Sequence, residues 1–177
     1  MLFQFECRVN DNDYYEFNRY FMFHSSYGKK NLFKIRMFVP IILSLMFIYY
    51  LISGESLDWL YYELVSFVIT SVVWVIAVKP FYLLILKINQ KSMKKSGKLP
   101  YSELSTMEFY DDHFIDITPD GRYELKYDAV DNVVINESKA IYIYRDMMAG
   151  HIIPFSTFKS EEERNRFIDF MHTKTNK

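Results

Sequence analysis

Five side chains between residues 111 and 120 are of types that bind metal ions. They are Asp111, Asp112, His113, Asp116 and Asp120. Carboxylates and imidazole are suitable ligands for divalent cations. Their spacing fits neither an EF-hand nor a zinc motif, and aspartate is common at turns because its side chain bonds its own backbone. We therefore interpret these residues as turn residues, and we expect no metal and no other cofactor.

A second group with potential chemistry follows His151, where Ser156, Thr157 and Ser160 could supply a nucleophile. Ser160 precedes three glutamates, which is the pattern of a helix capping box. His151 and His172 are isolated in the sequence, so we interpret both as structural. The chain has no glycine-rich phosphate loop and no HExxH or GxSxG motif. We therefore expect no catalytic residues.

The elements that would position these groups lie on both sides of an apolar hairpin. Met37–Ser53 and Leu64–Val78 are free of charged residues over 17 and 15 positions. A bilayer with a hydrocarbon core about 30 Å thick needs about 20 helical residues. We expect two membrane spans, at about 37–54 and 59–80.

Two prolines stand at the edges of these spans. Pro40 is expected in the first turn of the first span, where its missing N–H is tolerated. Pro80 follows Lys79 at the end of the second span. The helix either ends there or bends and continues.

The charges around the hairpin differ in sign. The connecting loop, residues 54–63, carries Glu55, Asp58 and Glu63 and no basic residue. Four basic residues precede the first span: Lys29, Lys30, Lys34 and Arg36. Six lysines and no acidic residue lie in the segment that follows the second span, residues 79–98. Basic flanks stay in the cytoplasm, which predicts a multi-pass protein of the inner (cytoplasmic) membrane with both termini cytoplasmic.

The basic segment at residues 87–98, after the second span, is the one candidate binding site. Its five lysines are Lys87, Lys91, Lys94, Lys95 and Lys98. Near anionic lipid headgroups, each lysine contributes about 1 kcal/mol of attraction. These residues are expected to contact anionic lipid as part of a topology signal that needs no specific lipid; the alternative is a specific, phosphoinositide-like site.

The N-terminal segment before the hairpin predicts a strand and a helix. Phe3, Phe5 and Cys7 alternate with polar residues, which is typical of a half-buried strand. Cys7 is then a small core residue. Residues 14–24 are rich in aromatic residues and predict a helix that packs on a soluble domain or lies at the membrane surface.

The segment after the hairpin predicts an α+β domain. Six short alternating segments are expected as strands, at residues 104–110, 113–118, 122–127, 131–136, 140–145 and 150–155. A helix follows Ser160. Short turns between the strands favour a small antiparallel sheet closed by a C-terminal helix, a pleckstrin-homology-like (PH-like) order that the N-terminal strand could extend. The expected domains are residues 1–28, 29–98 and 99–177.

Several motifs have the pattern of a known family. They are Asp13–Phe17 (DYYEF), Lys126–Val130 (KYDAV), Ala140–Tyr144 (AIYIY), Ile152–Pro154 (IIP) and Phe158–Glu162 (FKSEE). With the two-helix hairpin, they make the chain resemble the YcxB-like family of bacterial membrane proteins. The resemblance covers most of the chain, and it implies no catalytic residues.

The charge of the C-terminal domain bears on its partners. From Leu99 onward the chain has 15 acidic and nine basic residues. Nucleic acid would be repelled by this net charge. We expect a membrane-anchored cytoplasmic interaction or regulatory module with a protein partner, whose acidic domain docks on its own basic segments. The alternatives are an immunity protein against a toxin or bacteriocin and, less favoured, a membrane-associated enzyme.

Overall fold

The computed structural model describes residues 1–54, 56–97, 99–136, 139–145 and 149–175. Glu55 and Lys98, both named above, lie outside this described part. The chain divides into two compact units. The first consists of Met1–Asn18 and Gln90–Lys177, and the second is Arg19–Asn89. The N-terminal strand is therefore part of the same unit as the C-terminal strands.

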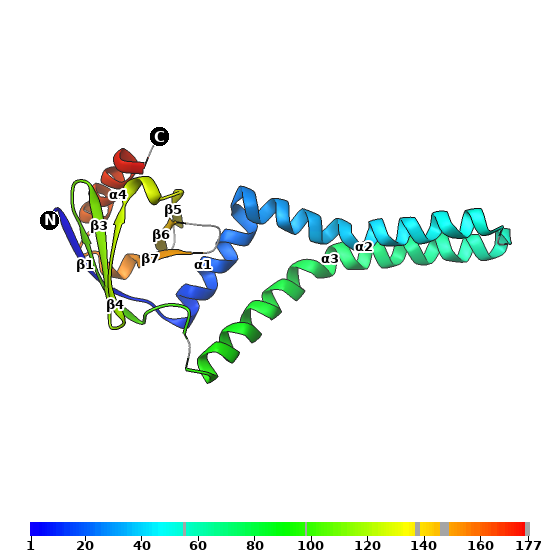
Figure 1. Cartoon of the computed structure of the whole chain (residues 1–177), viewed down its shortest axis with the longest axis horizontal. Coiled ribbons are helices and arrows are strands. Elements are labelled where there is room, and N and C mark those ends of the chain that lie inside the picture. Colours follow the sequence, from blue (N-terminus) through cyan, green and yellow to red (C-terminus); the bar gives the residue numbers. More distant parts are fainter. Residues whose placement is uncertain (55, 98, 137–138, 146–148, 176–177) are drawn as a thin grey trace. The chain divides into compact units, whose positions relative to one another are not determined.

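The first unit contains two antiparallel sheets (Figure 1). The first sheet has the order β1-β2-β3-β4, with strands at Phe3–Arg8, Leu104–Phe109, His113–Thr118 and Gly121–Lys126. The second has the order β5-β6-β7, with strands at Asn132–Asn136, Ala140–Tyr144 and Gly150–Pro154. The predicted α+β class is confirmed, but the strands form two sheets where one was expected. Strand β1 extends the first sheet by pairing with β2, with Phe3 opposite Phe109.

Helix α4 (Glu161–Thr175) follows the strands and is capped as its sequence predicts. The hydroxyl of Ser160 accepts a hydrogen bond from the backbone N–H of Glu163 at 3.2 Å. The carboxylate of Glu163 accepts one from the backbone N–H of Lys159 at 2.8 Å. One face of α4 enters the core through Phe167 and Met171, both fully buried. Two short 3-10 turns, η1 (Tyr127–Ala129) and η2 (Phe155–Thr157), complete the unit.

The core of the first unit lies between the two sheets and α4. Alternation in β1 and β2 turns Phe5, Cys7, Met107 and Phe109 to the same side, and all four are buried. The ring of Phe167 meets them edge-on, with its centroid 4.7 Å from that of Phe109. The second sheet contributes Ile141, Ile143 and Ile153 to this core. These apolar side chains account for most of the favourable free energy of folding of this unit.

Helix α1 (Asp11–His24) begins three residues before the predicted start. Asn10 caps it, because its Oδ1 accepts hydrogen bonds from the backbone N–H groups of Asn12 and Asp13. Within the first unit, Phe17 packs on β6, with ring centroids 5.3 Å from Tyr142 and 4.8 Å from Tyr144. Strand β6 is therefore buried on both faces, with isoleucines on one side and tyrosines on the other.

The second unit contains two long helices, α2 (Ser26–Ser53) and most of α3 (Leu57–Lys95). At 1.5 Å per residue, α2 is about 42 Å long and α3 about 58 Å long. Pro40 lies well inside α2, not in a first turn, and Pro80 lies inside α3, so α3 continues past it to Lys95. The indole N–H of Trp74 donates to the carbonyl of Ile35 at 3.0 Å and joins the two helices.

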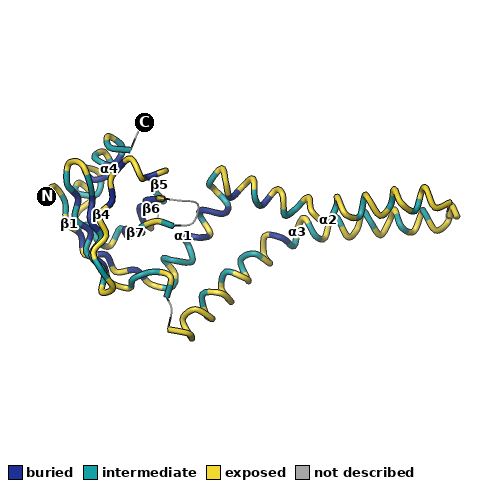
Figure 2. Tube along the Cα trace, viewed as in Figure 1, coloured by how far each residue is buried: buried dark blue, intermediate teal, exposed yellow. Residues whose placement is uncertain are grey.

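Both helices expose apolar surface over most of their length (Figure 2). Each contains an 18-residue window with a mean hydropathy of 2.1, of which 0% is buried in α2 and 6% in α3. Core helices of soluble proteins bury such windows. By length and composition, both helices can cross a membrane.

Candidate functional site

An ion pair joins the two sheets of the first unit. The Nδ1 of His151 in β7 lies 3.0 Å from the Oδ2 of Asp116 in β3. Only 16% of the His151 side chain and 13% of the Asp116 side chain are exposed. Neither residue is a surface group, because each projects from its strand toward the opposite sheet. His151, expected to be isolated, therefore has a partner from a distant part of the chain.

The strand registers explain why these two side chains meet. Asp116 is two residues after the buried Phe114, so both lie on the core face of β3. Across the sheet, Asp116 is opposite Met107 on one side and Tyr123 on the other. His151 is two residues before the buried Ile153 and shares its face of β7. Asp116 is thus a mid-strand residue facing the core, which corrects the interpretation that it occupies a turn.

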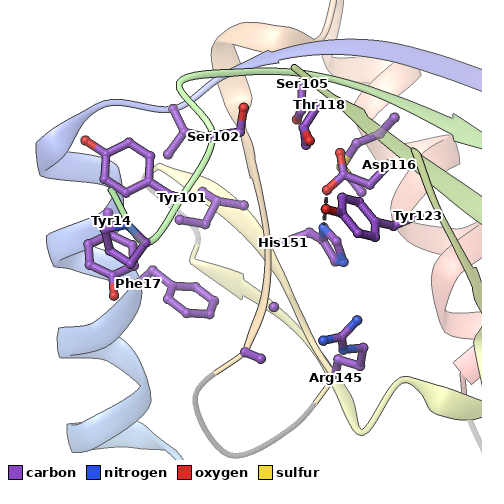
Figure 3. A pocket seen from close by; sticks show the side chains of 16 residues that line it. Tyr14, Phe17, Tyr101, Ser102, Ser105, Asp116, Thr118, Tyr123, Arg145 and His151 are labelled. Atoms are coloured by element: carbon purple, nitrogen blue, oxygen red, sulfur yellow. Dashed lines mark ion pairs between the residues drawn. The ribbon is translucent and has the colours of Figure 1, made fainter. Parts of the chain in front are cut away.

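A cavity of about 440 Å³ opens beside this ion pair. Figure 3 shows Tyr14, Phe17 and Tyr101 on one side of it and Asp116, Tyr123 and His151 on the other. Its remaining polar groups are the hydroxyls of Ser102, Ser105 and Thr118 and the guanidinium of Arg145. The cavity therefore combines an aromatic wall with several polar and charged groups.

The carboxylate of Asp116 has an unused acceptor. Its Oδ1 is buried and has no hydrogen-bond partner among the described residues. Cys7 lies near enough for this charge to act on it. The pKa of the Cys7 thiol is raised to about 12, mainly by burial; a hydrogen bond with Thr157 lowers it, and the charge of Asp116 raises it. The site therefore has one buried acceptor to offer and no reactive thiol.

A second polar cluster is centred on Asp11 in the first turn of α1. Its Oδ2 lies 2.5 Å from the Nζ of Lys94, in the last turn of α3. Its Oδ1 accepts a hydrogen bond from the hydroxyl of Tyr101 at 2.6 Å, and the ring of Tyr101 stacks on Tyr14 at 5.0 Å. The hydrogen bond from Lys94 is the largest cause of a lowered pKa at Asp11. These contacts hold Tyr101 in the wall of the cavity.

The other residues first weighed as metal ligands are not brought together. Asp111 pairs with Lys174 at 2.6 Å, and Asp112 pairs with His113 at 2.7 Å. Asp120 lies in the turn between β3 and β4. In the ranges that the structure describes, no group of three or more His, Cys, Asp or Glu side chains could hold a metal ion.

The lysines predicted to contact anionic lipid lie on one helix. Lys87, Lys91, Lys94 and Lys95 are all in α3, and Lys91 and Lys95 are exposed. Lys94 is also exposed by about half, although its ammonium group contacts Asp11. Contact of these residues with lipid stays a prediction.

No local motif points directly to the cavity, because its two key residues are 35 positions apart. The sequence signal for this contact is the alternation of side chains along each strand. Asp116 lies two residues from Phe114, and His151 lies two residues from Ile153, so each polar residue shares a strand face with an apolar one. A polar residue in phase with core residues on each of two strands indicates a buried polar contact.

Comparison with known proteins finds one family. Residues 109–171, just over a third of the chain, match the model of the family described as YcxB-like protein. The matched segment runs from the last residue of β2 to the buried Met171 of α4 and includes both members of the ion pair. No curated protein and no solved structure matches the chain.

Proposed function

We propose that this chain, which carries a YcxB-like domain over residues 109–171, is a two-span protein of the bacterial inner (cytoplasmic) membrane. In this proposal the domain is a recognition module on the cytoplasmic side. The observation that carries the membrane assignment is the exposure of α2 and α3. Their apolar windows are 0% and 6% buried by the chain itself. A hydrocarbon environment covers such surfaces without further protein.

The charges at the helix ends support the orientation. Asp58, at the start of α3, is followed by Glu63, and no basic residue lies near them. Lys29 and Lys30 lie in the first turns of α2, and Lys94 and Lys95 end α3. The positive ends of both helices belong in the cytoplasm. The YcxB-like domain, which follows α3, then lies there as well.

Topology can be tested with cysteine labelling, because the chain has a single buried cysteine, Cys7. We expect the protein to resist extraction by alkaline carbonate. A membrane-impermeant maleimide should label Asp58→Cys in intact spheroplasts. It should label Asp120→Cys, in the turn after β3, only after the cells are opened. Labelling of both variants in intact cells, or release by carbonate, would refute the proposed topology.

The cavity supports recognition as the role of the domain. A ligand that fits its chemistry would donate an N–H or O–H to the free Oδ1 of Asp116 and pack against the aromatic wall. The imidazole of His151 is engaged by Asp116 and meets the ring of Phe114 at 5.4 Å. We propose that this pair serves recognition and that the protein is not an enzyme.

Photocrosslinking in native membranes tests the recognition role. Tyr123 is half exposed at the cavity, so p-benzoylphenylalanine can replace it. We expect a distinct crosslinked product at this position that disappears when Asp116→Asn is added. The same photoreactive residue in place of the exposed Arg166 on α4 is the control. Identical products from both positions would contradict a specific role of the cavity.

A further inference from the structure

A second cavity, of about 540 Å³, lies within the unit Arg19–Asn89. Three helical segments form it: the end of α1, the beginning of α2 and the middle of α3. Its charged lining consists of Arg19, Lys29, Arg36 and Lys79, with His24 beside them. No carboxylate lines it among the described residues. Four permanent positive charges around one hollow favour an anion.

Arg36 provides an independent observation. Its Nε is buried and has no hydrogen-bond partner among the described residues. A buried donor without an acceptor is destabilising. A planar guanidinium binds phosphate oxygens through parallel hydrogen bonds. A phosphate group in the cavity would therefore satisfy a donor that the chain itself leaves unpaired.

The place of the cavity along both helices indicates the source of the phosphate. The uncharged stretch of α2 begins at Met37, directly after Arg36, and that of α3 ends at Val78, directly before Lys79. The cavity thus stands at the charged end of both apolar stretches, where a bilayer has its headgroups. Its apolar lining is Phe23, Leu32 and Phe33, and Phe33 is 64% exposed. Acyl chains can continue from such a lining along the exposed helix surface.

We propose that this cavity binds the phosphate headgroup of an anionic phospholipid from the cytoplasmic leaflet. The proposal rests on the membrane location proposed above, and it assigns a specific site on different residues from the basic segment of α3. Arg36 supplies the buried donor, and Lys29 of the same helix and Lys79 of α3 line the cavity with it. The ring of Phe23, 5.1 Å from the Nζ of Lys79, orients that lysine.

Native mass spectrometry of the full chain in a neutral detergent tests this site. We expect the wild type to retain phosphatidylglycerol in preference to phosphatidylcholine. Removing one positive charge that contacts the phosphate directly should reduce phosphatidylglycerol retention at least about 5-fold, because a charge-assisted hydrogen bond is lost. The double variant Lys29→Gln/Arg36→Gln should therefore lose about 20-fold or more, and Arg36→Lys should regain only part of the Arg36 contribution, because lysine lacks the planar fork.

A matched control lies on the same helix. Lys30 and Lys34 are exposed, belong to the same basic flank and do not line the cavity. Lys30→Gln/Lys34→Gln removes the same two charges and should change retention by less than about 2-fold. Equal losses in the two double variants would overturn the proposal in favour of diffuse attraction. Equal retention of phosphatidylcholine would also overturn it.

Two further experiments complete the test. The first distinguishes a lipid site from a site for a free anion, and the second distinguishes failure of the lipid site from failure of the membrane assignment. Inorganic phosphate and glycerol phosphate should fail to displace phosphatidylglycerol at millimolar concentration. If either displaces it, the cavity is a site for soluble phosphate and the lipid proposal is wrong. Carbonate extraction of Lys29→Gln/Arg36→Gln should match the wild type. A variant that stays in the membrane but has lost the lipid preference confirms the site, and release of the wild type itself refutes the membrane assignment instead.

Discussion

The Nδ1 of His151 lies 3.0 Å from the Oδ2 of Asp116, and this contact crosses from one β-sheet to the other. Both residues belong to the segment that matches the YcxB-like family model. A buried polar contact between two sheets fixes their relative position more specifically than apolar contacts do, because only one arrangement satisfies it. The same contact leaves the Oδ1 of Asp116 open to a ligand.

Breaking this ion pair should destabilise the domain. We expect Asp116→Asn and His151→Ala each to lower the free energy of unfolding by about 1–3 kcal/mol, the range for leaving a buried polar group without its partner. The double variant should lose less than the sum, because the two residues share one interaction. Pulse proteolysis in urea, on the full chain in detergent, measures these differences. Asp120→Asn, in an exposed turn, is the control and should be neutral. Strict additivity would show that the two side chains are not coupled.

The contact between Asp11 and Lys94 should make part of the stability depend on acid pH. The pKa of Asp11 is lowered in the folded chain, mainly by hydrogen bonds from Lys94 and Tyr101. The unfolded chain then binds the proton more tightly. The contribution of Asp11 is therefore complete above its ordinary pKa of 3.8 and is lost as the pH falls through the lower folded-state value.

A difference experiment isolates this group from the other carboxylates. The melting temperature of the wild type minus that of Asp11→Asn should be positive and constant near neutral pH, and should shrink below pH 3.8. The side chain of Asp11 is 45% exposed, so solvent screening keeps the difference small. The corresponding difference for Asp120→Asn should stay near zero at every pH. A difference for Asp11 that grows on acidification would show that folding raises the pKa of this carboxyl instead of lowering it.

Local patterns predicted most of the strands of the domain. The alternation of β3 predicted its bounds, His113–Thr118, without error, and the turn chemistry of Pro119 and Gly121 placed β4 to within one residue. Strand β1 was predicted from the alternation of its phenylalanines. These features depend on residues that are neighbours in the chain, so they can be predicted from the sequence.

Features that depend on distant contacts were not predicted. The division into two sheets arises after Lys126, where η1 interrupts the strands, and alternation alone does not indicate which strands pair. The sequence left open whether the second helix ends at Pro80 or continues beyond it, and the structure shows that α3 continues to Lys95. The basic cavity was missed because its residues come from three helices.

Cys7 should be unreactive in the folded protein. With a pKa of about 12 its thiolate is scarce at pH 8, about 10³-fold scarcer than for an ordinary cysteine, and burial blocks access as well. We expect no maleimide adduct on the native chain and one adduct after unfolding in urea, as measured by intact mass. The Asp120→Cys variant should carry one adduct in the native state and a total of two after unfolding. Rapid labelling of the native wild type would show that β1 leaves the sheet.

Gly28 should be the glycine at which an added methyl group most destabilises the second unit, Arg19–Asn89. It is buried in the first turn of α2, where the hydroxyl of Ser25 accepts a hydrogen bond from its N–H at 2.9 Å. A Cβ added there would overlap the carbonyl oxygens of Phe21 and Met22 in α1. Backbone atoms cannot move aside as a flexible side chain can, so the two helices would have to separate.

Gly54 gives the matched comparison for this substitution. It ends α2 with a φ of 75°, and nothing lies within 4 Å of an added Cβ. Gly54→Ala should cost about 1–2 kcal/mol from its left-handed backbone alone. Gly28→Ala should cost more, and a lower midpoint of thermal unfolding in detergent for Gly28→Ala than for Gly54→Ala checks the order. Because Phe23 of α1 and Lys29 of α2 both line the basic cavity, Gly28→Ala should also reduce phosphatidylglycerol retention without removing a charge. Unchanged retention together with lost stability would show that the cavity does not need the close approach of these two helices.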